Sequence, residues 1–231
     1  MSKINIFTPP EKCDDKSCNI LGGKKCPVKL FLAGTIDNGD SDNWQGDLIK
    51  AISNIELMRD VNVYNPRREE WPSADNYREI DRQIEWELFH LEKADLIVMN
   101  ILASSKSPIS LMELGLFAKG GRLIVFCPKT FYRYDNVRVV CKRYGIPLFT
   151  TNNIPFIAEK VCKYVGIDEE AEKEKRKASE RESLLKMKEN CKLPDGTTVK
   201  WYTELYEESK ERFEKEFGEP LCLEKELNTE T

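Results

Sequence analysis

The sequence predicts an α/β fold in which a doubly wound, five-stranded parallel sheet is followed by a helical C-terminal extension. From Val28 onward, short and almost wholly apolar runs alternate with amphipathic helical segments, a pattern typical of parallel strands joined by right-handed helical crossovers. The scarcity of polar residues in the runs indicates a sheet covered on both faces. We expect an N-terminal extension at 1–27, an α/β domain at 28–166 and a charged helical tail at 167–231.

The expected strands are short apolar runs, most of which stop at glycine, proline or asparagine. They cover 28–33, 61–64, 95–101, 122–127 and 147–149, and residues 4–7 could form one more short strand. Ligands of doubly wound sheets bind at the carboxyl ends of the strands. The loops where a site is expected are 34–43, 65–76, 101–108 and 128–137.

The expected helices lie between these runs, and two of them have clear start signals. Asp42 can cap the first helix, and Ser107-Pro108 is a good cap and first-turn pair for the third. The helices are expected from 42 onward and at 77–93, 107–119, 135–144 and 154–165.

The tail has two parts of different character. Residues 169–190 are dense in lysine and glutamate, which indicates a solvated helix or tether. Aromatic and apolar residues of 201–217 share one broad face of a further helix. We expect that helix to dock on its own domain or on a partner subunit.

Composition excludes several classes of protein. The 231 residues carry 36 lysines and arginines against 40 aspartates and glutamates, a formal net charge of −4, whereas proteins that wrap polymeric nucleic acid have a basic excess. No apolar run approaches the roughly 20 residues that span a membrane. The first residues lack the apolar stretch of a secretory signal, so we expect a cytoplasmic protein.

Cysteine and histidine usage argues against metal and cofactor chemistry. We expect the eight cysteines to be reduced thiols. Cys13, Cys18 and Cys26 cluster before the apolar run at 28–33 but include no CxxC pair and no nearby histidine. His90 is the single histidine and falls outside the apolar stripe of its helix, so a surface position is expected. We therefore predict no metal and no cofactor.

Two glutamates occupy unusual positions. Glu87 falls inside the apolar stripe that Ile80, Ile84, Leu88 and Leu91 form on the second helix, where a carboxylate is costly unless it is paired, hydrogen-bonded or facing a cleft. It could equally mark a wet helix end or a carboxylate that meets an arginine.

Glu113 lies in an otherwise almost wholly apolar segment after the third strand. Either Ser110 and Glu113 form a capping box, or the helix begins at Ser107-Pro108 and Glu113 lies in its second turn, facing the ligand crevice. In the second case we expect an ionised carboxylate, because the positive helix end favours it. Two carboxylates that converge on one crevice are typical of glycosyl chemistry, in which one attacks the anomeric carbon and the other manages protons.

Five ordered motifs in residues 28–150 resemble the nucleoside 2-deoxyribosyltransferase family, in its branch with Ser-Pro-Ile-Ser before the catalytic Glu-Leu-Gly. They are FLAGTI at 31–36, NWQ at 43–45, YNPRR at 64–68, WEL at 86–88 with AD at 94–95, and SPISLMELG at 107–115. The resemblance implies a flavodoxin-like domain that forms a homodimer or higher oligomer. It also implies a small-molecule substrate, a 2′-deoxyribonucleoside or deoxynucleotide, with a free nucleobase as acceptor.

The resemblance assigns the two glutamates their roles. Glu113 matches the nucleophile that would attack C1′, expel the base and leave a covalent deoxyribosyl ester for a second base or water. Glu87 matches an acidic position that is usually aspartate in the family and that helps with protons. Ser107 stands where many members carry an aspartate, so a sugar-hydroxyl contact is missing or made by Ser107.

Further substrate-binding candidates come from the same motifs. Gly34 and Thr35 match the first-strand loop under the ligand, and Asn136 lies where members lend a side chain to the neighbouring subunit's site. Trp44 could stack on a base or belong to the core, and Trp71 could also stack. Other candidates are Asn65 in the YNPRR motif and Arg67, which with Arg68 could face a 5′-phosphate or anchor the loop.

Three alternatives stay open. The protein could hydrolyse deoxynucleoside 5′-monophosphates, with Arg67, Arg68 or Arg138 holding the phosphate. It could be a nucleotide-binding module without turnover, or a glycohydrolase of NAD, against which the ordered motifs count.

Overall fold

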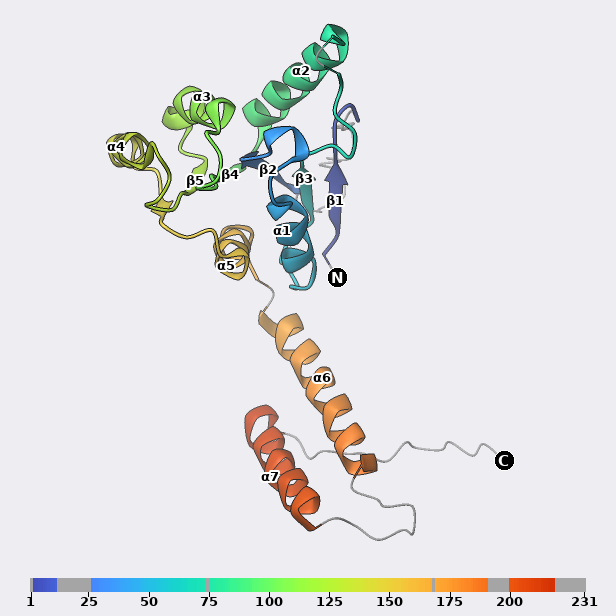
Figure 1. Cartoon of the computed structure of the whole chain (residues 1–231). Helices are drawn as coiled ribbons and strands as arrows, with labels where there is room; N and C mark the ends of the chain where they lie inside the picture. Colours follow the sequence, from blue (N-terminus) through green and yellow to red (C-terminus); the bar gives the residue numbers. More distant parts are fainter. Residues whose placement is uncertain (1, 12–25, 74, 168, 191–199, 219–231) are drawn as a thin grey trace. The chain divides into compact units, whose positions relative to one another are not determined.

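The chain forms two compact units, Met1–Ile167 and Asp168–Thr231 (Figure 1). The computed structural model describes residues 2–11, 26–73, 75–167, 169–190 and 200–218. Cys13 and Cys18, which are expected to be reduced thiols, lie outside these ranges.

The first unit is built on a parallel sheet with strand order β1-β3-β2-β4-β5-β6. The strands are β1 (Ile4–Phe7), β2 (Val28–Gly34), β3 (Val61–Tyr64), β4 (Leu96–Asn100), β5 (Leu123–Phe126) and β6 (Leu148–Phe149). The expected five-stranded, flavodoxin-like sheet is thus present, with strand order 2-1-3-4-5 when β2 is counted first. The sheet has six strands instead of the expected five, because β1 pairs with β3 and forms an additional edge strand.

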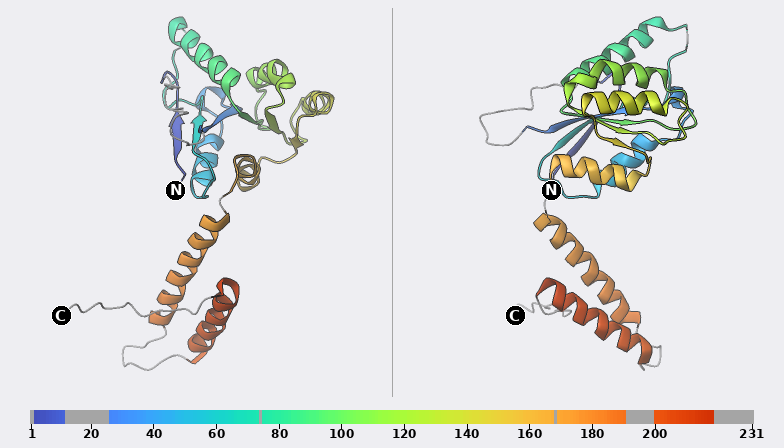
Figure 2. Two further views of the ribbon diagram at one scale, coloured as in Figure 1. Left: turned by 180° about the vertical axis from the view of Figure 1, so that it is seen from behind. Right: turned by 90° about the vertical axis from the view of Figure 1, so that its left-hand side faces the viewer.

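Helices cover both faces of this sheet, as the apolar strands predict (Figure 2). One layer holds α1 (Trp44–Ser53) and α5 (Ile154–Val165), and the other holds α2 (Tyr77–Lys93), α3 (Pro108–Phe117) and α4 (Tyr134–Tyr144). Successive strand residues point to opposite layers: Leu30 and Leu32 belong to the core beneath α1 and α5, whereas Phe31 and Ala33 belong to the core beneath α2, α3 and α4.

The caps of α1 and α3 differ from expectation. Asn43, not Asp42, caps α1, because its side-chain oxygen accepts a hydrogen bond from the Gly46 amide at 3.1 Å. Ser107 does hold the position before α3, but its hydroxyl makes no capping bond. Since α3 begins at Pro108, Ser110 and Glu113 do not form a capping box.

β2 lies between β3 and β4 in the sheet. The strands that follow it in the chain are therefore added on opposite sides of β2, which makes its carboxyl end a topological switch point. Gly34 ends β2 with φ of 130°, and a Cβ there would lie 2.1 Å from the carbonyl oxygen of Asn100. This close approach lets the Thr35 amide donate to the same oxygen at 2.9 Å. Ligands bind at such topological switch points.

The second unit contains α6 (Glu169–Asn190) and α7 (Lys200–Phe217), which contact each other. Leu184 of α6 and Tyr206, Phe213 and Phe217 of α7 are buried, and Arg176 pairs with Glu216 at 2.6 Å. Apolar side chains of α7 therefore pack within its own unit. The side chains of Trp201 and Tyr202 lie outside the described residues.

Cys127, Cys141 and Cys162 are buried free thiols, as expected. Cys26 is disulfide-bonded, so the expectation of reduced thiols throughout is wrong there. Within the described residues, no helix has the length and apolar character needed to cross a membrane. The same residues contain no group of three or more histidine, cysteine or acidic side chains placed to hold a metal ion.

Candidate active site

A cavity of about 650 Å³ opens at the carboxyl ends of β2, β3 and β4, and we call it the carboxylate cavity. It is large enough for a nucleoside-sized ligand. The residues after β2 form one wall, α2 forms another, and the start of α3 forms the third. The lining residues are Phe31, Ala33–Asn38, Pro66, Trp71, Pro72, Ile80, Gln83, Ile84, Glu87, Leu88, Ser107–Ser110, Met112 and Glu113.

Glu113 projects into this cavity from the second turn of α3. Only 7% of the residue is exposed, and its helix is otherwise almost wholly apolar. A buried carboxyl in such a setting is costly to ionise. Its position is therefore typical of a reactive group rather than of a solvated surface acid.

Glu87 lines the same cavity from α2, where Gln83 holds it. The Gln83 side-chain amide donates to Glu87 Oε1 at 2.6 Å and to the carbonyl oxygen of Pro66 at 3.0 Å. Within the described residues, Glu87 meets this amide and no arginine. Gln83 thus ties the carboxyl to the loop after β3 and fixes its orientation.

Three of the four residues of the apolar stripe of α2 face this cavity, and the fourth, Leu91, belongs to the core. Ile80, Ile84 and Leu88 line the cavity, whereas the buried face of the helix carries Trp86, His90 and Leu91. His90 is only 3% exposed and stacks on Trp86 with ring centroids 4.2 Å apart. The surface position expected for His90 is therefore wrong, because an aromatic cluster encloses the ring.

The two carboxyls are electrostatically coupled. Burial, and secondarily the charge of Glu87, raise the pKa of Glu113 to about 8. Burial raises the pKa of Glu87 to about 7, although the hydrogen bond from Gln83 favours its ionised form. The expectation that the start of α3 keeps Glu113 ionised is wrong at neutral pH, because desolvation outweighs the helix end. Near neutrality the pair holds about one proton.

A chain of hydroxyl groups forms the floor between β2 and α3. Thr35 Oγ1 and Ser107 Oγ lie 2.6 Å apart, and Ser107 Oγ donates to Ser105 Oγ at 3.1 Å. Ser105 Oγ in turn donates to Asp37 Oδ1 at 2.7 Å. The Leu102 amide also donates to Thr35 Oγ1 at 2.9 Å, so the network fixes the start of α3 and hence Glu113.

Backbone strain is concentrated at this floor. Among the described residues, the non-glycine positions with positive φ are Asp37 at 49°, Asn38 at 52° and Ser107 at 44°, and all three line the carboxylate cavity. Such conformations cost of the order of 1 kcal/mol or more each and cluster at functional sites.

Arg67 does not line the cavity but holds its rim. Its guanidinium donates to the carbonyl oxygens of Gly39 and Ser41, both at 2.6 Å, and to that of Asp42 at 3.2 Å. Of the two alternatives for Arg67, a phosphate contact and a loop anchor, the structure provides the anchor. Asn65 supports the same turn, since its side chain accepts from the Arg67 amide at 3.1 Å.

The other predicted substrate-binding residues are divided between the cavity lining and the core. Gly34, Thr35 and Ser107 line the cavity. Trp44 belongs to the core, where its indole nitrogen donates to the carbonyl oxygen of Thr35 at 2.9 Å. Trp71 lines the cavity and packs against Gly39, where a Cβ would lie 2.7 Å from its indole nitrogen. Asp37 and Gln83 also line the cavity, but neither forms part of a recognisable motif, so neither is among the residues predicted from the sequence.

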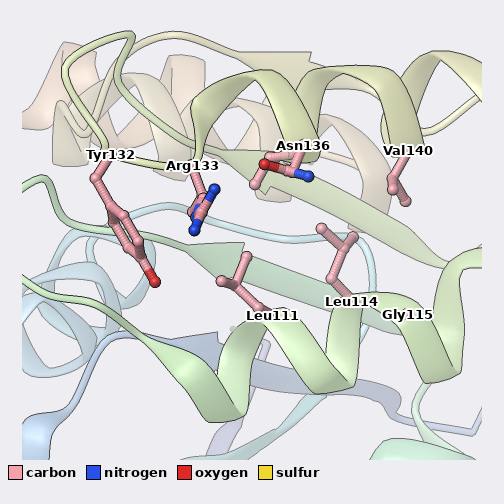
Figure 3. A pocket seen from close by; sticks show the side chains of 8 residues that line it. Leu111, Leu114, Gly115, Tyr132, Arg133, Asn136 and Val140 are labelled. Carbon is pink, nitrogen blue, oxygen red and sulfur yellow. The ribbon is translucent and has the colours of Figure 1, made fainter.

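Asn136 lies elsewhere, in a second cavity of about 310 Å³ between α3 and α4. Figure 3 shows Leu111 and Leu114 of α3 pointing toward α4, with Arg133 and Asn136 opposite them. We call this the α3–α4 cavity. Asn136 is therefore not among the described residues that line the carboxylate cavity of its own chain.

Comparison with known proteins agrees with this geometry. Residues 27–131 match a family model described as nucleoside 2-deoxyribosyltransferase like. The matched segment contains β2–β5, α1–α3 and both cavity glutamates. No curated protein matches the chain.

Proposed function

We propose that this protein cleaves the N-glycosidic bond of 2′-deoxyribonucleosides through a covalent deoxyribosyl–glutamate intermediate. The observation that carries the proposal is the pair of coupled carboxyls, buried Glu113 and half-buried Glu87, in one nucleoside-sized cavity. The similarity of residues 27–131 to nucleoside 2-deoxyribosyltransferases supports the choice of substrate.

The higher pKa of Glu113 places the shared proton mainly on that carboxyl. In the reactive form of the pair, which is the less populated one, the proton lies on Glu87 and Glu113 is ionised. A carboxylate oxygen of Glu113 attacks C1′ as the bond between C1′ and the base nitrogen breaks, with an oxocarbenium-like transition state. The bonding electrons leave with the base, which takes the proton from Glu87. The products of this half-reaction are a neutral base, a deoxyribosyl ester at Glu113 and an ionised Glu87.

The second half-reaction releases the sugar. A second base or a water molecule attacks C1′, Glu113 leaves as a carboxylate, and Glu87 accepts the proton of the attacking nitrogen or oxygen. The apolar wall of Ile80, Ile84 and Leu88 offers a flat base a surface to pack against. We propose transfer to another base or to water, with no cofactor and no metal ion.

The test is incubation of the purified protein with single deoxynucleosides, with and without a second free base, followed by chromatography. A new nucleoside shows transfer, and free base with free deoxyribose shows hydrolysis. If neither appears with any deoxynucleoside or deoxynucleotide, the proposal fails and a binding module without turnover takes its place.

We also propose that the protein acts as a homodimer or larger homo-oligomer. Ile109, Met112 and Leu116 are each more than half exposed on α3, beside the carboxylate cavity. Exposed apolar groups of this kind favour a subunit contact, across which Asn136 would serve the neighbouring site. Light scattering should give a mass of at least two chains, and Leu116→Glu should reduce it. A monomeric wild-type protein would refute this part.

A further inference from the structure

The two glutamates of the carboxylate cavity differ in what holds their carboxyl groups. Glu87 Oε1 accepts a hydrogen bond from the Gln83 side chain at 2.6 Å. Among the described residues, no group donates a hydrogen bond to the carboxyl of Glu113, on which burial and the charge of Glu87 act instead. A hydrogen bond donated to a carboxyl favours its ionised form. The single proton of the pair is therefore drawn away from Glu87 and toward Glu113.

The side-chain amide of Gln83 has one possible orientation. Its Nε2 donates to the carbonyl oxygen of Pro66 at 3.0 Å as well as to Glu87. If the amide were turned over, Oε1 would face the Pro66 oxygen, and a carbonyl oxygen has no hydrogen to donate. In the observed orientation Gln83 Oε1 is buried without a hydrogen-bond partner among the described residues, which is costly. The two donated bonds outweigh this cost, so Gln83 acts on Glu87 as a donor.

Gln83 is also fixed in space. It is 6% exposed and precedes Glu87 by four residues on α2, a spacing that places two side chains next to each other on a helix. Pro66 belongs to the loop after β3, so the two bonds of Gln83 join α2 to a second element of the fold. Because Glu87 Oε1 is held as an acceptor, the other oxygen, Oε2, carries the proton when Glu87 is protonated.

The other charges of the cavity do not distinguish the two glutamates. Among the described lining residues, the charged ones are Asp37, Glu87 and Glu113, and none of these is a cation. Asp37 accepts a hydrogen bond from Ser105 Oγ at 2.7 Å. The guanidinium of Arg67 lies outside the lining and binds the carbonyl oxygens of the loop after β2. Gln83 is therefore the polar group that makes the carboxyls of Glu87 and Glu113 unequal.

This inequality has a consequence for catalysis. A protonated Glu113 is not a nucleophile. A base bound beside Glu87 brings a ring nitrogen with a lone pair, which accepts a hydrogen bond from Glu87 only when Glu87 is protonated. Binding then favours the form that has the proton on Glu87. Since the coupled pair holds about one proton, that proton comes from Glu113, which becomes ionised while the total charge of the pair stays the same.

We infer that Gln83 is a positioning residue that keeps the proton of the empty site on Glu113, so that Glu113 becomes a nucleophile only when a bound base offers Glu87 a nitrogen to hydrogen-bond. The second half of this inference rests on the proposed glycosidic cleavage at the same site. The first half rests on the hydrogen bonds of Gln83 alone, and it concerns the protein without any ligand.

The experiment is a pH titration of the protein by NMR, with ¹³C in the glutamate side-chain carboxyls. The two signals are assigned by their loss in Glu87→Gln and in Glu113→Gln. In the wild-type protein the step at lower pH should move mainly the Glu87 signal, and the step at higher pH mainly the Glu113 signal. Gln83→Met removes the donor and keeps an unbranched side chain, and Gln83→Leu is a second variant for the case that the first does not fold.

In either variant the Glu87 signal should titrate about one pH unit higher than in wild type, and the Glu113 signal should titrate lower. Arg82→Leu is the matched control, because Arg82 is exposed on the same helix and does not line the cavity. It should keep the wild-type order of the two steps. An unchanged order and spacing of the steps without Gln83 would overturn the inference, whether or not the protein cleaves deoxynucleosides.

The effect of a ligand is measured on the wild-type protein at about pH 7, where the pair holds about one proton. Adenine, hypoxanthine, cytosine and thymine are added one at a time, and binding is any spectral change that saturates. A bound base should move the Glu113 signal toward its ionised position. A bound base that leaves Glu113 protonated would overturn the inference and leave glycosidic cleavage intact. Absence of binding by every base, together with absence of cleavage of every deoxynucleoside, would instead refute the proposed function.

Discussion

The two cavities that α3 lines differ in charge, although the same helix contributes to both. In the α3–α4 cavity, α3 presents Leu111, Leu114 and Gly115, and the charged lining residue is Arg133. In the carboxylate cavity, α3 presents Glu113 opposite Glu87, and desolvation raises the pKa of both groups. The two helices α2 and α3 thus place a destabilising acid pair in one cavity, and such a cost is typical of a site that performs chemistry.

The largest expected effect is at Glu113. Glu113→Gln keeps the shape but removes the nucleophile, so kcat for deoxynucleoside cleavage should fall by about 10³-fold or more. Val140→Ala, which enlarges the α3–α4 cavity, should leave kcat within about threefold, since a lost contact there changes stability only. A Glu113→Gln protein that retains most of its activity would remove the distinction between the two cavities.

The next largest effect concerns the shared proton. Activity needs one protonated and one ionised carboxyl, so kcat/KM should be bell-shaped in pH and highest between about 7 and 8, where the pKa values of Glu87 and Glu113 lie. Glu87→Gln should lower activity by about 10²-fold and remove the base limb of the profile, because no second carboxyl remains whose loss of a proton abolishes the acid.

Glu85→Gln is the control for this variant, because Glu85 lies on the same helix, is exposed and does not line the cavity. It should reproduce the wild-type pH profile. A flat profile for the wild-type protein between pH 5 and pH 9 would contradict the shared proton.

A smaller effect on activity is expected for Arg67, which binds the loop after β2. Arg67→Ala removes the donors to Gly39 and Ser41 and should raise KM by about tenfold while kcat changes by less than about threefold, because the loop is positioned and does not react. Arg68→Ala is the neighbouring control, since Arg68 pairs with the exposed Glu79 at 3.6 Å. Equal effects of the two variants would show that Arg67 has no special role.

The smallest expected effect is on stability. The folded-state pKa of Glu113, about 8, lies above the unfolded value of 4.5, so its contribution to stability is complete below pH 4.5 and is lost as pH rises through about 8. Glu113→Gln mimics the protonated form and should stabilise the fold at pH 9 by of the order of 2 kcal/mol. At pH 4.5 it should have little effect.

Thermal unfolding at the two pH values measures this difference. If Glu113→Gln were stabilised over wild type by the same amount at pH 4.5 and at pH 9, the stabilisation would not come from the ionisation of Glu113.

Most of the fold can be predicted from the sequence because its strands are continuous apolar runs. The boundary of α2 (Tyr77–Lys93) is recovered to the residue. The edge strand β1 is less certain, because four residues with partial burial carry a weak signal. The cap of α1 is missed by one position, since Asp42 and Asn43 are adjacent and both can cap.

The candidate site is predictable where an acid interrupts an apolar pattern, as Glu87 and Glu113 do. The burial of His90 is not, because it depends on stacking against Trp86 and Tyr64, which three-dimensional packing brings together. Asp37 is missed for a different reason. Asp37 lines the cavity with a positive φ, and nothing in the sequence distinguishes it in this respect from the neighbouring aspartates.

The measurement that tests the central claim most directly is mass spectrometry after reaction with a 2′-fluoro deoxynucleoside analogue that forms the ester faster than it releases it. The account predicts one added fluorodeoxyribosyl group on the peptide that contains Glu113, and none in Glu113→Gln. A label on another residue, or release of base from the analogue without any label, would contradict the covalent mechanism.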